Sequence, residues 1–303
     1  MLIFEAIQRS DLQYVQTYLE SNESVHIRNE RGSTPLHEAV FENNVDIVRL
    51  LLTYGAPVNI VDEFGNTPLH IACMIGNQKA AQMLLAHGAE IDVVSEARSW
   101  TPLMLALNEN DTAMADWLIS QGANLNHVDQ DQGWTPLLIA CDLGLSDFTL
   151  KLIEKGSHVN ATIKDGDAKG RSAIHLLSYY GEVEAIRAII DQGVDVNLMP
   201  EGGGLSALHW SVYNNHYQLM KFLVEHQADV NIQASGFYLN RAPLHYAVSS
   251  LRLDVAEYLL NYGADPLLED AEGLSPVRMA FIRSQASGKK ESQQLLAMLE
   301  NYI

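Results

Sequence analysis

A tetrapeptide that recurs along the whole chain is the feature that most restricts its fold. Its copies range from TPLH to SPVR and begin 33 to 37 residues apart, at Thr34, Thr67, Thr101, Thr135, Ser172, Ser206, Ala242 and Ser275. Threonine and serine are favourable N-caps, and proline suits the first helical turn, so each copy predicts the start of a helix. A repeat of this length indicates supersecondary units that stack on one another.

A second marker stands 21 residues after each start, at Gly55, Gly88, Gly122, Gly156, Gly193, Gln227 and Gly263. Glycine suits the left-handed residue that ends a helix, whereas Gln227 would be strained there. Two helices and a turn fit between start and marker, and all length variation falls in the loop that follows. The same spacing places a first start at Met1 and its stop at Asn22. From Ser275, it predicts a loosened turn over 283–292 and a closing helix.

Apolar pairs stand seventeen and eighteen residues after each start. They are Leu51/Leu52, Leu84/Leu85, Leu118/Ile119, Leu152/Ile153, Ile189/Ile190, Leu223/Val224 and Leu259/Leu260. One such pair per block predicts burial against the neighbouring block, because a single block cannot bury its own apolar face.

The repeated T-P-L-H-x-A motif, together with "GAPVN" at Gly55, "GVDVN" at Gly193 and "QADVN" at Gln227, resembles the ankyrin-repeat family over residues 1–303. The resemblance implies an all-α repeat fold, a solenoid of about nine stacked helix pairs with hairpin-like finger loops. We expect a single domain over 1–303, with an N-terminal cap repeat at 1–29, seven internal repeats at 30–274 and a C-terminal cap repeat at 275–303. The resemblance also implies protein binding through the fingers and the concave inner helices, without catalysis or a cofactor.

The formal charge of −19 disfavours nucleic acid as a partner and favours a partner with a basic surface. No apolar run is long enough for membrane insertion, and the N-terminus does not read as a signal peptide. Two cysteines, Cys73 and Cys141, are too few for a disulfide framework. We therefore expect a cytoplasmic protein, with translocation into a host cell as the alternative. The oligomeric state stays open, with a monomer favoured.

The stretch "DGDAKGRSAIHLL" at Asp165 comes close to a phosphate-binding loop. Such a loop needs G-x-x-x-x-G-K-[ST] after a strand, whereas here Gly166 and Gly170 are one residue too close and Arg171 replaces lysine. We interpret this stretch as the end of a finger, with Ser172 starting the next helix.

Five histidines recur at one position of the block, at His37, His70, His175, His209 and His245. A metal ladder would need ring nitrogens that converge on one ion, but stacked helices lie about 8–10 Å apart. We therefore expect no metal site and assign these side chains to hydrogen bonds with neighbouring turns, as the family implies. Cys73 and Cys141 are expected to be buried thiols.

Large aromatic and apolar side chains stand where fingers and inner helices of this family contact partners. The predicted partner-binding residues are Phe41, Phe64, Met74, Tyr179, Tyr180, Trp210, Tyr213, Phe237 and Tyr238. We expect the main groove beside the two longest fingers, 164–171 and 233–241, with an aromatic floor and acidic surroundings. Trp100 and Trp134 directly precede helix starts, and either packing on neighbouring fingers or partner contact would explain them.

The sequence therefore predicts a non-catalytic adaptor, inhibitor or scaffold that binds another protein. A bacterial effector, a neutraliser of a toxin and a receptor for a small ligand are the alternatives, while an enzyme is disfavoured because no convergent polar cluster is apparent. The "DVN" asparagines Asn197 and Asn231 could be hydroxylated by family analogy, although holding the turn explains them better.

Overall fold

The computed structural model describes residues 3–166, 168–287 and 289–303. It forms two compact units, which meet in sequence between Asp131 and Gln132. Met1, where the spacing places the first helix start, and Asp167 in the 164–171 finger lie outside the described residues. The described residues hold eighteen α-helices and no strand, with one isolated bridge between Thr162 and Ser172. The predicted all-α repeat fold is therefore confirmed.

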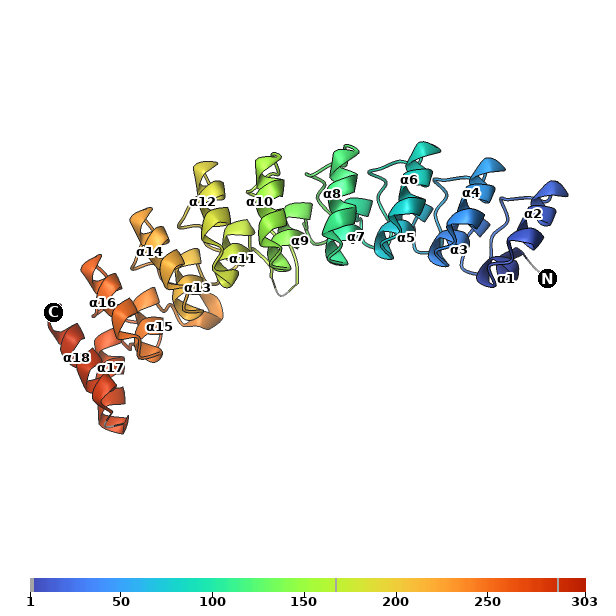
Figure 1. The fold of residues 1–303 in the computed structure, drawn as a ribbon. Helices are drawn as coiled ribbons and strands as arrows, with labels where there is room; N and C mark the ends of the chain where they lie inside the picture. Colours follow the sequence, from blue (N-terminus) through green and yellow to red (C-terminus); the bar gives the residue numbers. More distant parts are fainter. Residues whose placement is uncertain (1–2, 167, 288) are drawn as a thin grey trace. The chain divides into compact units, whose positions relative to one another are not determined.

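Unit 1 consists of four helix pairs, in which each odd-numbered helix is followed by its even-numbered partner. They are α1 (Ile3–Gln8), α2 (Leu12–Glu20), α3 (Pro35–Phe41), α4 (Val45–Thr53), α5 (Pro68–Met74), α6 (Gln78–Ala86), α7 (Pro102–Asn108) and α8 (Thr112–Ser120). The odd-numbered helices lie side by side in one row and the even-numbered helices in a second row (Figure 1). We call the odd-numbered helices of each unit the inner helices and the even-numbered helices the outer helices.

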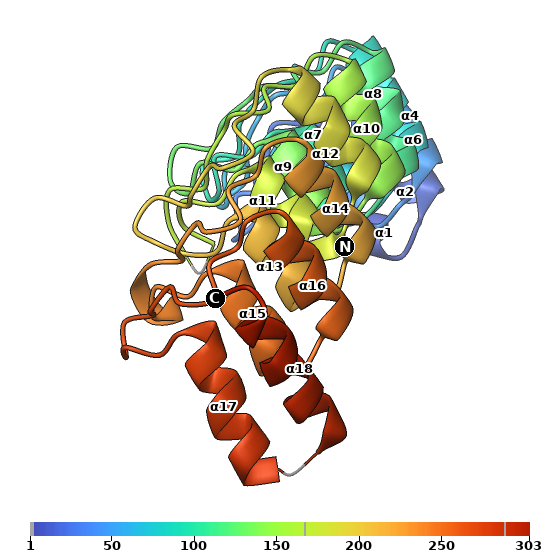
Figure 2. The ribbon, with the colours of Figure 1, turned by 90° about the vertical axis from the view of Figure 1, so that its left-hand side faces the viewer.

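Unit 2 continues the same pattern with five pairs. They are α9 (Pro136–Asp142), α10 (Ser146–Glu154), α11 (Ala173–Tyr180), α12 (Val183–Asp191), α13 (Ala207–Tyr213), α14 (Tyr217–Glu225), α15 (Pro243–Ser249), α16 (Leu253–Asn261), α17 (Pro276–Ser287) and α18 (Lys290–Glu300). A 3-10 turn, η1 (Gly236–Tyr238), lies in the loop before α15. Figure 2 shows α11, α13 and α15 in one row, with the connecting loops of this unit extending to one side.

The core of each unit includes the apolar pairs between neighbouring blocks. The first member of every pair, from Leu51 to Leu259, is fully buried. The second member is buried in four blocks, whereas Leu85, Ile119 and Ile190 are half-buried. Burial of each fully enclosed leucine or isoleucine contributes about 1.5–3 kcal/mol, so these contacts between blocks stabilise the stack.

The helix ends follow the sequence markers. Asn22 has φ of 55° and Gln227 has φ of 69°, so both adopt the predicted left-handed conformation. The prediction for the last block is wrong in part, because α17 continues through residues 283–287 and α18 begins at Lys290. These residues include no proline and few turn formers, so nothing ends α17 earlier. The assignment of 1–303 to one domain with terminal cap repeats stays a prediction.

The "DVN" asparagines join consecutive turns. The Asn197 amide donates to the carbonyl oxygen of Gln227 at 3.2 Å and accepts from the N–H of Asp229 at 2.7 Å. Asn231 makes the equivalent bonds to Gly263 and Asp265, at 2.9 and 2.8 Å. The structural role expected for these two side chains is confirmed.

Candidate functional site

Buried histidines fix the start of five inner helices. In α5, Nδ1 of His70 accepts the N–H of Thr67 at 3.0 Å, and Nε2 donates to the carbonyl oxygen of Val93 at 3.1 Å. In α13, Nδ1 of His209 accepts the backbone N–H of Ser206 at 3.2 Å, and Nε2 donates to the backbone carbonyl oxygen of Arg241 at 2.9 Å. Because Nδ1 accepts a backbone N–H, the proton of each neutral ring lies on Nε2. The predicted bonds to neighbouring turns are confirmed.

Burial keeps these imidazoles neutral. It lowers the pKa of His70, His175 and His209 from 6.5 to about 4, although hydrogen bonds to backbone carbonyls oppose the shift. The pKa values of His37 and His245 are lowered for the same reason. Among the residues that the structure describes, no three His, Cys, Asp or Glu side chains are grouped to hold a metal ion.

A continuous series of aromatic rings crosses three inner helices of unit 2. The ring centres of Tyr179 on α11 and Trp210 on α13 lie 5.3 Å apart, and those of Trp210 and Tyr213 lie 6.2 Å apart. Tyr213 meets Tyr246 on α15 at 5.9 Å, and Tyr180 meets Tyr179 at 5.1 Å. All four pairs are edge-to-face, a favourable arrangement for aromatic rings. We call these five residues the aromatic surface.

Trp210 differs from the three exposed tyrosines of this surface in its burial. We expected it to be an exposed contact residue, but only 8% of it is exposed, whereas Tyr213 is 56% exposed. The rings of Tyr179 and Tyr213 flank the indole, and the Arg171 guanidinium lies 5.2 Å from its ring centre. Trp210 is therefore a buried side chain against which the exposed Tyr179 and Tyr213 pack.

Sequence reasoning missed Tyr246 as a member of this surface. It stands four residues after the Ala242 start, the same offset that separates Trp210 from Ser206, so the repeat itself offered the signal. Tyr246 is 9% exposed, and its burial raises its pKa to about 12.

The 233–241 finger projects beside the aromatic surface. Phe237 at its tip is fully exposed, and Tyr238 is half-buried. A hollow of about 270 Å³ lies between the finger and the rings. Its lining is largely aromatic and consists of Leu205, Trp210, Tyr213, Phe237, Tyr238, Leu239, Arg241 and Tyr246.

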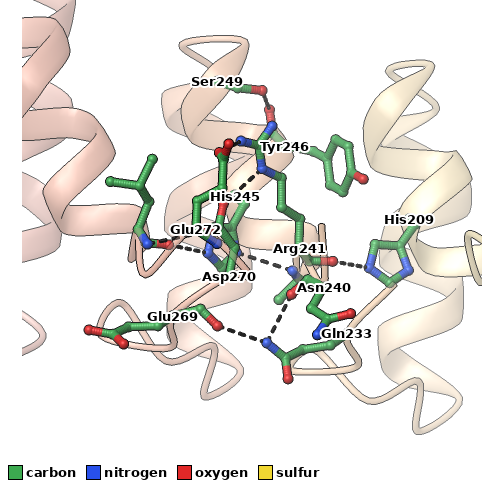
Figure 3. A network of polar contacts seen from close by, with 12 residues as sticks. His209, Gln233, Asn240, Arg241, His245, Tyr246, Ser249, Glu269, Asp270 and Glu272 are labelled. Carbon is green, nitrogen blue, oxygen red and sulfur yellow. Dashed lines mark hydrogen bonds and ion pairs between the residues drawn. The ribbon is translucent and has the colours of Figure 1, made fainter. Parts of the chain in front are cut away.

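Polar contacts hold this finger in place (Figure 3). The Gln233 amide donates to the carbonyl oxygens of Asn240 and Glu269 at 2.8 and 2.9 Å. Arg241 pairs with the buried Asp270 at 3.0 Å and with Glu272 at 3.4 Å. The Asp270 carboxylate is desolvated, which alone would raise its pKa, but bonds from backbone N–H groups and Arg241 outweigh burial and lower it.

The finger also contains two consecutive left-handed residues, Leu239 and Asn240, with φ of 56° and 53°. Leucine in this region is strained by about 1 kcal/mol or more. The N–H of Ala271 donates to the carbonyl oxygen of Leu239 at 2.7 Å, so the next finger fixes this conformation. Strain held by surrounding contacts is common at functional sites.

The remaining predicted contact residues lie in unit 1. Phe41, Phe64 and Met74 are exposed and line a second groove, of about 740 Å³. The nine predicted residues thus form two groups, one in each unit. Trp100 and Trp134 are both half-buried, so their position is compatible with either interpretation.

The stretch resembling a phosphate loop has its backbone engaged within the finger. The Gly170 N–H donates to the carbonyl oxygen of Ile163 at 2.7 Å, and Ser172 is buried at the start of α11. A Cβ at residue 170 would collide with the backbone of Glu201, so the glycine allows two fingers to approach closely.

The cysteines are buried, as expected. Cys73 and Cys141 are free thiols with no exposed surface, and burial raises the pKa of Cys141 to about 12. Protonated thiols of this kind are poor nucleophiles.

Comparison with protein families gives one family model, described as "Ankyrin repeats (3 copies)", which matches residues 3–95, 90–163, 158–234 and 204–270. A search of the curated proteins found no match. None of the helices in the described parts of the chain combines the length and apolar character that crossing a bilayer requires.

Proposed function

The chain belongs to the ankyrin-repeat family, and from this premise we propose that it is a non-catalytic adaptor, inhibitor or scaffold that binds a protein through the aromatic surface and the 233–241 finger of unit 2. Ankyrin repeats are in general protein–protein interaction modules.

The observation that carries the proposal is the exposure of four aromatic side chains at one place. Tyr179, Tyr180 and Tyr213 are 47%, 41% and 56% exposed on consecutive inner helices, and Phe237 is fully exposed beside them. Exposed apolar surface of this extent is unusual unless a partner covers it, and tyrosine, tryptophan and phenylalanine are enriched at the core of protein interfaces.

The surface is also preorganised for binding. Tyr180 donates to the carbonyl oxygen of Asp142 at 2.6 Å, and the network around Arg241 fixes the finger that carries Phe237. Rings that are already ordered lose little conformational freedom when a partner docks, so more of the contact energy contributes to affinity.

A protein partner suits the site better than a small ligand. The hollow beside Phe237 measures about 270 Å³, below the roughly 300–1,000 Å³ of ordinary ligand pockets. The exposed rings continue beyond it onto α11, as a flat protein interface requires. A toxin neutraliser or an effector would use the same surface, with a different partner.

Affinity capture followed by mass spectrometry tests the proposal. We expect the wild-type chain to retain a partner that both Phe237→Ala and Tyr213→Ala lose. Tyr262→Ala serves as the matched control, because Tyr262 is 49% exposed at the end of the outer helix α16. If both variants retained the partner as well as the wild type, the binding surface would lie elsewhere.

A further inference from the structure

A second groove lies on unit 1, between its inner helices and fingers. Its volume is about 740 Å³, and its apolar lining includes Phe41, Phe64, Met74 and Ile75. Phe41 and Met74 occupy the last positions of the neighbouring helices α3 and α5, while Phe64 stands on the finger before α5. These three elements therefore present one apolar floor.

The floor is open to solvent. Phe41 is 61% exposed, Phe64 is 55% exposed, and Met74 and Ile75 are 42% and 39% exposed. Four large apolar side chains at one place form a patch of the kind that marks an interaction site, whereas single exposed residues need no explanation.

Carboxylates share the lining of this groove with the apolar floor. Glu5 and Glu38 come from the inner helices α1 and α3, and Glu30 and Asp62 come from the fingers. Arg31 is the one Lys or Arg among the described lining residues, so the groove carries four formal negative charges against one positive charge. Its field therefore attracts cationic side chains to a groove with an apolar floor.

This arrangement discriminates between classes of occupant. A second copy of the chain would itself carry a formal charge of −19, so the acidic groove would repel it. An acidic partner would be repelled for the same reason. We propose that the unit 1 groove docks a basic, amphipathic segment of a partner protein, with its apolar side chains on Phe41, Phe64 and Met74 and its lysines or arginines at the carboxylates. This inference does not rest on the aromatic surface of unit 2.

The spacing of the helices sets the pattern of such a segment. Neighbouring stacked helices lie about 8–10 Å apart, so contacts over Phe41 and Met74 are separated by about that distance. In an extended chain that distance corresponds to about three residues. The segment is therefore short, with two apolar side chains separated by few residues and basic residues on either side.

A display library of random 12-residue peptides provides the probe. Peptides are selected on the wild-type chain after counter-selection on the Phe41→Ser/Met74→Ser variant. We expect the selected peptides to combine leucine, isoleucine or phenylalanine with lysine or arginine and to lack acidic residues. Fluorescence anisotropy of one selected peptide should show at least 10-fold weaker binding to Phe41→Ser/Met74→Ser and to Glu30→Gln/Glu38→Gln, and weaker binding at higher salt.

Two controls separate this groove from the other site and from misfolding. Tyr213→Ala should bind the peptide as the wild type does, because Tyr213 belongs to unit 2. The circular dichroism and thermal melts of the groove variants should match those of the wild type, because Phe41, Met74 and Glu30 are exposed and Glu38→Gln keeps an oxygen that can accept from the Gln8 amide. Acidic or uncharged selected peptides, equal binding to the groove variants, or absence of enrichment would overturn the proposal. Self-association that Phe41→Ser/Met74→Ser abolishes would also overturn it, because a second copy would then occupy the groove.

Discussion

Lowering the pH from 7 to 5 should destabilise this protein strongly, because its buried histidines resist protonation in the folded state. The imidazoles of His70, His175 and His209 have no exposed surface, and their pKa falls from 6.5 to about 4 on folding. Protonation would place a second proton on Nδ1, which already accepts a backbone N–H. Folding and protonation are therefore opposed at each ring.

The sign and size of the effect follow from proton linkage. Between pH 6.5 and about 4 the unfolded chain binds these protons and the folded chain does not, so the free energy of unfolding falls as the pH falls through this window. A pH of 5 lies about 1.5 units below the unfolded-state pKa of 6.5. The free energy of unfolding therefore falls by about 2 kcal/mol for each ring and by about 6 kcal/mol for the three. His37 and His245 act in the same direction.

Urea unfolding followed by circular dichroism at the two pH values measures the loss, and His209→Gln identifies its source. The variant should be less stable at pH 7, but its loss between pH 7 and pH 5 should be smaller than that of the wild type by about 2 kcal/mol. Carboxylate titration is common to both proteins and cancels in this comparison. Imidazole NMR signals of the folded protein that titrate near pH 6.5 for these three residues would refute the reasoning.

Further predictions concern stability and the contact surface. Leu152→Ala should lower the free energy of unfolding by about 2–5 kcal/mol in urea titrations, because Leu152 is fully buried between blocks. Gln227→Gly should raise the melting temperature through a gain of about 1 kcal/mol, since Gln227 is left-handed; an unchanged or lower melting temperature would contradict this. Asn197→Ala should cost about 0.5–1.5 kcal/mol per lost hydrogen bond on urea unfolding, because the exposed N–H of Asp229 and carbonyl oxygen of Gln227 exchange this partner for water. Phe237→Ala should leave the melting temperature within about 1 °C of wild type while abolishing partner capture, because Phe237 is fully exposed.

Most of the fold could be predicted from the sequence because each block encodes its own start and stop. Thr67 begins α5 and His87 caps the end of α6, one residue before the left-handed Gly88, as the fixed spacing requires. The end of α17 could not be predicted in this way. The first helix of other blocks ends before a left-handed residue such as Asn43 or Gly76, whereas Ser284 stands at the equivalent position of the last block. Residues without a strong stop signal follow their helical neighbours, so α17 runs on to Ser287.

The candidate site was harder to predict because sequence position does not determine exposure. Tyr213 and Phe237 stand at positions that suggest contact, and both are exposed. Trp210 has an equally suggestive position, but its neighbours cover it, and only the packing of α11 against α13 reveals this. Arg241 contacts Asp270 and Glu272, which lie about thirty residues further along the chain. No local sequence pattern predicts these two ion pairs.

The histidine bonds give the repeat array a direction. His37 donates to a carbonyl further along the chain, in the loop that leads to the next helix start, as do His70, His175, His209 and His245. A fragment cut short at its carboxyl side before such a loop would therefore retain an imidazole donor whose acceptor has been removed, whereas a fragment cut at its amino side would lose donor and acceptor groups more evenly. Shortened versions of this protein should tolerate deletion from the front better than deletion from the back.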